Sequence, residues 1–355
     1  MHEVINYNIR FKSVQNALEK AQIYKFFVQD LQDIRWLTGF DGSVAHMILS
    51  QEKFFLLVDE RYTSYAQKFV TENSKLKVVQ VSSSSLYSTI FDIIDGDLYN
   101  ISGSNTSIDS LKKMQEARLE VSELDYDPIA ELRLVKDGYE RQTIFEALQC
   151  AETAFKKTKQ IELPITEKEF QRKLDSEMLI AGADKPSFET IVASGPNSLQ
   201  PHSRPTNRTI EEGEFVIVDW GAEIDGYKSD TSRTIWWGEI SAEQKRVYDA
   251  VKEAHYVAVE FMRPGMTYGE VTDSAVEVFE EHGFGDCIKH PFGHNIGLGI
   301  HEHPFFSQSE DTLIQSGHVF AFEPAIYVPG VGGVRLENLY CVAEEETMFL
   351  NSLEF

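Results

Sequence analysis

Four of the ten histidines of the chain, His290, His294, His301 and His303, lie in one short segment, HPFGHNIGLGIHEHP. Each of them alone could be an ordinary loop or core residue, but such clustering is not expected from composition. The glycines interleaved with them disfavour a regular helix and allow the backbone to approach another group closely. The cluster as a whole therefore indicates a functional site.

A second candidate site surrounds Asp225-Gly226, a dipeptide that favours a two-residue hairpin turn. With that turn, Asp219 opposes Ser232 and Asp230 opposes Gly221. Side chains two residues apart share a face of a strand, so the two aspartates are diagonal neighbours, roughly 7–8 Å apart at the backbone. Two such carboxylates repel each other unless a cation is bound or one of them is protonated. A solvated hairpin decorated with acids remains the alternative for this segment alone.

Two glutamates lie inside apolar, strand-like segments, Glu323 at the end of VFAFEP and Glu337 in GGVRLEN. Burying a carboxylate there is costly unless the group is paired or binds a metal. For Glu337, an ion pair with Arg335 remains the alternative.

Together these segments supply four carboxylates and one imidazole. Such a set is large enough for two divalent cations with bridging carboxylates. Because it is hard and oxygen-rich, with one nitrogen, it suits Mn²⁺, Fe²⁺ or Co²⁺ better than a structural zinc. In chain order the candidate ligands are Asp219, Asp230, His294, Glu323 and Glu337.

The elements that must position these residues are helices and strands in two similar halves. Apolar residues recur at helix spacing from Gly138 to Lys159, and Thr166 with Glu169 forms a capping box for the next helix. Further helices are expected at 241–262 and 267–282, with Ser241 and Thr267 as caps. Strand-rich stretches at 190–238 and 289–343 complete the halves. This order is compatible with a pseudo-symmetric α/β architecture.

The N-terminal part predicts a separate small α/β domain with a mixed sheet. Residues 11–29 have the pattern of an amphipathic helix that ends in an apolar FFV run, and strands are expected at 45–49, 54–58 and 77–81. The polar, proline-containing segment 125–128 is the best boundary. We therefore predict one domain at 1–125 and another at 126–355.

Composition excludes several classes of function. A length of 355 residues favours two domains, and a net charge of −24 counts against nucleic acid or membrane as the main partner. The three cysteines show no CxxC spacing, so a disulfide framework is not expected and a reducing cytoplasm fits best. No signal peptide or membrane-spanning segment is expected from the apolar runs.

The five candidate ligands and the motifs around them resemble those of one known protein family. The order and spacing, with ten residues between Asp219 and Asp230 and the motifs GHNIG, EPA and RLE, resemble the pita-bread metallopeptidase family. The resemblance is to its Xaa-Pro branch, prolidase and aminopeptidase P. The family motifs are GHGIG-like, EPG-like and RIE-like, so Asn295 and Ala325 replace glycines. The resemblance implies that the five candidates are the metal ligands.

Further matches extend the resemblance over nearly the whole chain. The segment IVASGPN followed by Pro201-His202 resembles the one that carries a substrate-side histidine, and His301 matches the second active-site histidine. In the N-terminal part, LTGF at 37–40 and DERY at 59–62 resemble the creatinase-type domain that accompanies prolidases. The segment from Leu132 to Lys136 resembles the entry into the catalytic domain.

The resemblance implies an α/β (α+β) chain, in which a small mixed-sheet N-terminal domain precedes a pseudo-symmetric pita-bread catalytic domain. It implies hydrolysis of the peptide bond preceding proline in peptides with a free N-terminus, with two divalent metal ions, manganese first and cobalt or iron as alternatives. Glu323 is then both ligand and acid/base, while His202 and His301 stabilise the tetrahedral intermediate. His290 and Arg335 are expected to contact substrate, and a homodimer is expected.

Two other functions remain open at this stage. One is a creatinase-like hydrolase of another small amide, which the five intact ligands disfavour. The other is a peptidase-like binding module without catalysis, which should have lost ligands or active-site histidines. The sequence does not decide between a dipeptidase and an aminopeptidase.

Overall fold

The computed structural model describes residues 5–70, 75–95, 99–102, 107–117, 119, 121–124, 127–344 and 346–355. The chain forms two compact units, Val4–Arg133 and Leu134–Phe355, and passes from one to the other within helix α6 (Pro128–Leu134). The boundary predicted at 125–128 includes Asp125 and Tyr126, which lie outside the described residues, so its position stays a prediction. In the described part of the chain, no helix combines the length and apolar character needed to cross a membrane.

The N-terminal unit is built on a six-stranded mixed sheet with strand order β4-β3-β2-β1-β5-β6. The pairs β1–β2 and β2–β3 are antiparallel, whereas β3–β4, β1–β5 and β5–β6 are parallel. This is the mixed α/β sheet that the sequence predicts. The strands are β1 (Lys25–Val28), β2 (His46–Ser50), β3 (Phe54–Val58), β4 (Leu76–Gln80), β5 (Tyr99–Ser102) and β6 (Val121–Leu124).

The helix predicted at 11–29 is wrong in its C-terminal part. Helix α1 covers Tyr7–Lys20, and the FFV run that follows is strand β1. The backbone reverses at Gln22, which has a φ of 57°, and Phe26 and Phe27 are buried in the sheet opposite Leu49 and Ile48. Aromatic and β-branched residues fit a buried strand better than the end of a helix. The other helices of this unit are α2 (Leu31–Thr38), α3 (Glu60–Ala66), α4 (Leu86–Ile94) and α5 (Ile108–Glu116).

The second unit contains the four helices that the sequence predicts. They are α7 (Gly138–Thr158), α8 (Glu167–Ile180), α9 (Ala242–Phe261) and α10 (Tyr268–Glu281). Capping boxes start α8 at Thr166 and Glu169, α9 at Ser241 and Gln244, and α10 at Thr267 and Glu270. These reciprocal bonds satisfy backbone N–H groups that otherwise lack partners at a helix start.

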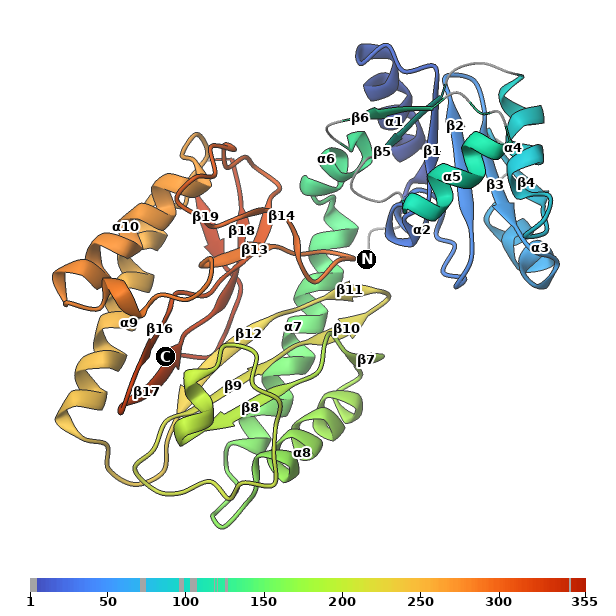
Figure 1. The fold of residues 1–355 in the computed structure, drawn as a ribbon. Helices are drawn as coiled ribbons and strands as arrows, with labels where there is room; N and C mark the ends of the chain where they lie inside the picture. Colours follow the sequence, from blue (N-terminus) through green and yellow to red (C-terminus); the bar gives the residue numbers. More distant parts are fainter. Residues whose placement is uncertain are drawn as a thin grey trace. The chain divides into compact units, whose positions relative to one another are not determined.

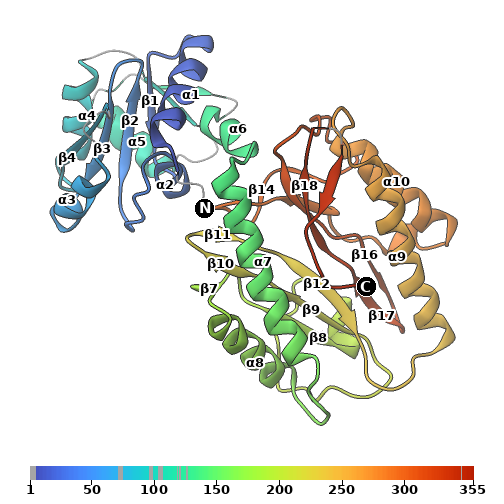
Figure 2. The same cartoon turned by 180° about the vertical axis from the view of Figure 1, so that it is seen from behind.

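Strands from both halves lie between the two helix pairs, α7 with α8 and α9 with α10 (Figures 1 and 2). They form sheets ordered β11-β10-β7, β12-β9-β8, β14-β13-β15-β18-β19 and β16-β17. The strands of the first half are β7 (Lys185–Pro186), β8 (Ile191–Ser194), β9 (Val216–Trp220), β10 (Ala222–Ile224), β11 (Tyr227–Lys228) and β12 (Thr231–Ile235). Those of the second are β13 (Gly293–Asn295), β14 (Glu302–Phe305), β15 (Val319–Phe322), β16 (Ala325–Val328), β17 (Gly332–Arg335), β18 (Asn338–Val342) and β19 (Thr347–Phe349).

The two halves repeat one local arrangement. The N-cap of α8, Thr166, forms a β-bridge with Thr209, and the N-cap of α10, Thr267, forms one with Leu313. A separate apolar core lies under each helix pair, with Phe155, Phe170 and Trp220 in one and Phe279, Phe292 and Phe322 in the other. The pseudo-symmetry predicted from the order of elements is therefore present in the structure, and the sheets between the cores carry the candidate site.

Candidate metal centre

Strands β9 and β12 place the two candidate aspartates on one hairpin. Asp219 pairs with Ser232, and beyond the interruption of the strands Ile224 pairs with Tyr227, so the predicted register holds at both ends. At the interruption, a Cβ added to Gly221 would lie 1.9 Å from the backbone oxygen of Ser229. Only glycine permits this close approach, which keeps the hairpin in register beside the acids.

The other three candidate ligands come from the second half of the unit. His294 lies on β13 opposite Ala321 of β15, and Glu323 directly follows β15. Glu337 lies between β17 and β18, and its backbone N–H donates to the backbone oxygen of Ser232 at 3.1 Å. This last bond joins the second half to the hairpin that carries the aspartates.

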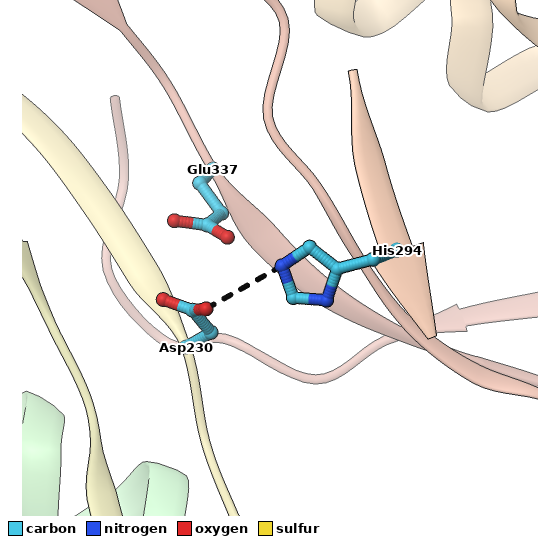
Figure 3. Close-up of side chains that lie close together, drawn as sticks. All are labelled: Asp230, His294 and Glu337. Carbon is cyan, nitrogen blue, oxygen red and sulfur yellow. Dashed lines mark ion pairs between the residues drawn. The ribbon is translucent and has the colours of Figure 1, made fainter. Parts of the chain in front are cut away.

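Three of the five candidates converge most closely. One donor atom from each of Asp230, His294 and Glu337 lies within 4.8 Å of the other two, and all three residues are buried. Figure 3 shows their side chains pointing toward one another, with Nε2 of His294 3.6 Å from Oδ2 of Asp230. The same nitrogen lies 3.8 Å from Oε1 of Glu323. Four of the five candidates therefore lie together, and Nε2 of His294 faces the carboxylates of Asp230 and Glu323.

Arg335 connects the fifth candidate, Asp219, to this group. Its Nη2 donates to Oδ2 of Asp219 at 2.6 Å, and its Nε donates to Oγ of Ser232 at 2.9 Å. Ser232 in turn donates to Oε2 of Glu337 at 2.8 Å. The alternative of an ion pair between Arg335 and Glu337 is replaced by this indirect link, because the guanidinium bonds Asp219 and reaches Glu337 through a hydroxyl.

The cluster contains more buried negative charge than its arginine balances. Burial and the neighbouring carboxylates hold the pKa values of Asp230 and Glu337 well above the usual range, and burial raises the pKa of Glu323 to about 8. Oδ1 of Asp219 and Oδ1 of Asp230 are buried without a hydrogen-bond partner among the described residues. Buried carboxylate oxygens without donors are costly unless they bind a cation or take up a proton.

The tautomer of His294 suits a metal ligand. Its Nδ1 lies 3.0 Å from the backbone oxygen of Asn295, which can only accept, so Nδ1 carries the proton and Nε2 presents a lone pair. Burial lowers the pKa of His294 to about 4, so the ring is neutral at physiological pH. Four carboxylates and one neutral imidazole thus fit the group of divalent cations expected from the sequence.

The remaining predicted residues surround the same cavity, of about 420 Å³. The rings of His301 and His294 meet edge to face with centroids 4.5 Å apart, and both His301 and His202 are exposed side chains of the cavity wall. Nδ1 of His290 donates to the oxygen of Pro291, so its Nε2 accepts from the hydroxyl of Tyr327 at 2.8 Å. All nine site residues predicted from the sequence line this cavity: His202, Asp219, Asp230, His290, His294, His301, Glu323, Arg335 and Glu337.

Comparisons with known proteins agree with this arrangement. The model of Metallopeptidase family M24 matches residues 142–344, and the Creatinase/Prolidase N-terminal domain matches residues 10–135. A Xaa-Pro dipeptidase of Pyrococcus furiosus is 32% identical over 350 residues, covering 97% of this chain and 98% of the relative.

The chain belongs to metallopeptidase family M24.

Solved structures agree on the whole fold of this M24 chain. The Xaa-Pro dipeptidase from Bacillus anthracis superposes with a TM-score of 0.92 at 29% identity, over 98% of each chain. The X-Pro aminopeptidase from Thermotoga maritima gives a TM-score of 0.83 at 28% identity, over 96% of this chain and 98% of that one. The α/β architecture with a creatinase-type N-terminal domain and a pita-bread catalytic domain, inferred from the motifs, is confirmed.

The structure also explains the two positions at which this M24 chain departs from the family glycines. Nδ2 of Asn295 donates to the oxygen of Pro304 and to the hydroxyl of Tyr268, each at 2.9 Å, so its side chain joins β13 to β14 and α10. The Cβ of Ala325 lies in a small apolar cluster with Ile217 and Tyr327. Both larger side chains fill buried space next to the candidate ligands.

Sequence reasoning missed Tyr327. Its hydroxyl accepts from Nη1 of Arg335 at 3.0 Å and donates to His290, and it therefore orients two residues of the cavity. No signal in the sequence points to it, because a tyrosine in the apolar segment AIYV is equally typical of a core strand. Pro201, whose backbone oxygen accepts from Arg335 at 3.1 Å, was not recognisable as a partner either.

Proposed function

We propose that this chain hydrolyses the peptide bond preceding proline in peptides with a free N-terminus. The observation that carries the proposal is the convergence of five candidate ligands in one buried, acidic cluster, in a chain similar over its length to Xaa-Pro dipeptidases. Because all five candidates are intact, neither a metal-free creatinase-like reaction nor a non-catalytic binding module is favoured.

In this proposal Asp219, Asp230, His294, Glu323 and Glu337 hold two divalent cations. Divalent cations, when bound, supply an activated water and polarise the scissile carbonyl. Manganese is our proposal for the native metal, with cobalt or iron as alternatives. We also propose a cytoplasmic homodimer.

Glu323 is the proposed acid/base. It follows strand β15 at the cavity wall, and its carboxylate lies between Nε2 of His294 at 3.8 Å and Nε of Arg335 at 3.9 Å. It accepts a proton from the attacking water and returns that proton to the leaving prolyl nitrogen. The nitrogen of the departing proline thereby becomes a neutral amine, and the carboxylate is regenerated.

His202 and His301 are the proposed donors to the tetrahedral intermediate. Both are exposed on the cavity wall, and the edge-to-face contact with His294 places His301 next to the metal cluster. A hydrogen bond that forms only when the carbonyl oxygen becomes an oxyanion lowers the barrier without tightening substrate binding.

The cavity also suits the proline ring and the α-amine of the proposed substrate. An imide nitrogen has no N–H, so the proline ring needs apolar contact more than donors, and Phe188, Ile191 and Phe305 line the cavity. A substrate ammonium is attracted by the acidic cluster. We therefore expect peptides with a free α-amine to bind better than blocked ones.

The test is hydrolysis of a peptide panel by Mn²⁺-loaded protein. Ala-Pro and Ala-Pro-Ala should be cleaved at the bond before proline, whereas N-acetyl-Ala-Pro and Ala-Ala should be poor substrates, and removal of metal by EDTA should abolish the rate. Equal cleavage of acetylated and free peptides would replace the proposal with an endopeptidase or an unrelated amidohydrolase.

A further inference from the structure

We propose that Arg204 binds the C-terminal carboxylate of the substrate and thereby makes this chain a dipeptidase. The inference rests on the proposed function, since it concerns which Xaa-Pro peptides the same cavity accepts. It assigns the choice between dipeptides and longer peptides to one side chain outside the ligand cluster.

Arg204 lies on the cavity wall two residues after His202. Its side chain is 84% exposed, and its Nε lies 3.4 Å from Oε2 of Glu189, which is itself 58% exposed and lines the same cavity. Among the described residues Glu189 is the ion-pair partner of Arg204, and the pair uses Nε alone. Both Nη groups therefore remain available to a ligand.

The other charged donor of the cavity wall is already engaged. Arg335 is buried and donates to Asp219, Ser232 and Tyr327. Among the described residues that line the cavity, Arg204 is thus the permanent cation with donors to spare.

A Xaa-Pro dipeptide presents opposite charges at its two ends. The acidic cluster suits its ammonium, so its carboxylate needs a cation elsewhere on the wall. A guanidinium can bond a carboxylate with two parallel N–H groups, and its planar fork can hold a second carboxylate through the remaining N–H. Glu189 at Nε therefore orients Arg204 without blocking the Nη groups.

Apolar residues stand beside both members of the pair. Phe188 precedes Glu189 and Pro205 follows Arg204, and both line the cavity. They suit the pyrrolidine ring of a proline whose carboxylate reaches the guanidinium. In a longer peptide a neutral amide replaces that carboxylate, so Arg204 gains no charge-assisted bond and selectivity for dipeptides results.

The experiment compares Ala-Pro with Ala-Pro-amide, which has the same size and lacks the negative charge. Mn²⁺-loaded wild-type protein should prefer Ala-Pro. Arg204→Gln should lose roughly ten- to a hundredfold in kcat/KM on Ala-Pro, the range of hydrogen bonds to charged groups, mainly through KM. Its rate on the amide should be unchanged, and Arg204→Lys should restore part of the loss.

Two further variants separate this role from others. Glu189→Gln should keep the preference for Ala-Pro; a loss on both substrates would instead assign Glu189 to the substrate ammonium. Arg246→Gln is the matched control, because Arg246 forms an exposed pair with Glu243 at 2.8 Å outside the cavity. It should leave both rates unchanged.

Product inhibition gives a second readout, since proline carries the carboxylate and prolinamide does not. Proline should inhibit the wild type more strongly than prolinamide, and this difference should vanish in Arg204→Gln. If Arg204→Gln changed both substrates equally, or neither, the inference would be overturned while Xaa-Pro hydrolysis stood. If wild-type protein cleaved neither Ala-Pro nor its amide, the proposed function itself would fail.

Discussion

Asp230 shows how a single buried carboxylate reports the need for a cation. It is 5% exposed, its Oδ1 has no partner among the described residues, and three other carboxylates raise its pKa further after burial. Such a group destabilises the fold when ionised and alone. Its presence at this position does not favour the stability of the fold and supports the proposal that it binds a metal.

Asp230→Asn is therefore expected to lower the metal content and to raise the stability of the metal-free protein. The bound metal should fall below two ions per chain and the hydrolysis rate by more than about a hundredfold, since a ligand matters at least as much as its supporting partners. The metal-free variant should be more stable than metal-free wild type by about 1–3 kcal/mol, because the amide replaces a buried carboxyl that must either carry an unbalanced charge or take up a proton. Elemental analysis and urea unfolding measure both quantities. Full metal content with an unchanged rate would contradict the ligand assignment.

The raised pKa values of the acids predict how pH acts on the metal-free protein. Burial raises the pKa of Glu323 from 4.5 to about 8, so the folded state keeps a proton that the unfolded chain releases above about pH 4.5. The stability that Glu323 contributes to the metal-free protein is then full below this pH and falls as the pH rises toward 8. Cations must displace the same protons, so Mn²⁺ affinity should rise over that window.

Thermal melting between pH 5 and pH 8.5, with and without Mn²⁺, checks this prediction. The stabilisation by Mn²⁺ should grow with pH and level off near pH 8. His294 should not compete with Mn²⁺ in this range, because burial lowers its pKa to about 4. In the metal-free protein its buried neutral ring adds stability as the pH rises from 5 toward its unfolded pKa of 6.5. A stabilisation by Mn²⁺ that stayed constant or fell between pH 5 and pH 8 would contradict it.

Variants of His301 and His202 are expected to keep their bound metal, unlike variants of the candidate ligands. His301→Ala and His202→Ala should each lower kcat by about 10²–10³, the usual effect of losing one donor to an oxyanion, with metal content unchanged. Metal analysis beside steady-state rates tests this. Collapse of the metal content would make these histidines ligands and would overturn their assigned role.

At the scale of elements, the site depends on pairings of very different sequence separation. The register of the Asp219–Asp230 hairpin could be predicted because a two-residue turn at Asp225-Gly226 fixes every pair that follows. The pairing of β13 with β15, which brings His294 and Glu323 together, could not, since nothing local specifies it. That His294 and Glu323 belong to one site was predicted from the resemblance to a family and not from periodicity.

Local sequence patterns also gave a wrong prediction where the same residues are compatible with either a helix or a strand. By periodicity the FFV run continues an amphipathic helix. In the structure it is a strand, because Phe26 and Phe27 become fully buried between neighbouring strands. His255 of α9, whose Nδ1 donates to the oxygen of Leu336, is another contact that no motif reveals. It anchors the segment that ends in Glu337.

Asn295 gives the prediction that belongs to this scale. Asn295→Gly restores the family residue but removes the bonds to Tyr268 and Pro304, so it should destabilise the protein by about 2–3 kcal/mol. Ala325→Gly, which removes a buried methyl and no hydrogen bond, should cost about 1 kcal/mol and serves as the control. Urea unfolding distinguishes them, and metal content should stay constant. Equal losses of stability in the two variants would contradict a stabilising role for the Asn295 amide.

For the whole molecule, the acidic character and the site have a common physical basis. The net charge of −24 repels polyanions, and the four candidate carboxylates line the cavity, so cations and substrate ammonium groups are favoured ligands. Composition alone could exclude partners but could not name a substrate. The substrate proposal needed the motifs, the shape of the cavity and the relatives together.

The central claim is that five residues of one chain hold two divalent cations on which Xaa-Pro hydrolysis depends. Its most direct test is a titration of metal-free protein with Mn²⁺, in which bound metal and the rate on Ala-Pro are measured in the same samples. We predict that two ions bind per chain and that the rate rises with them to a plateau. Hydrolysis by the metal-free protein, or a chain that binds Mn²⁺ and never cleaves Ala-Pro, would contradict the account.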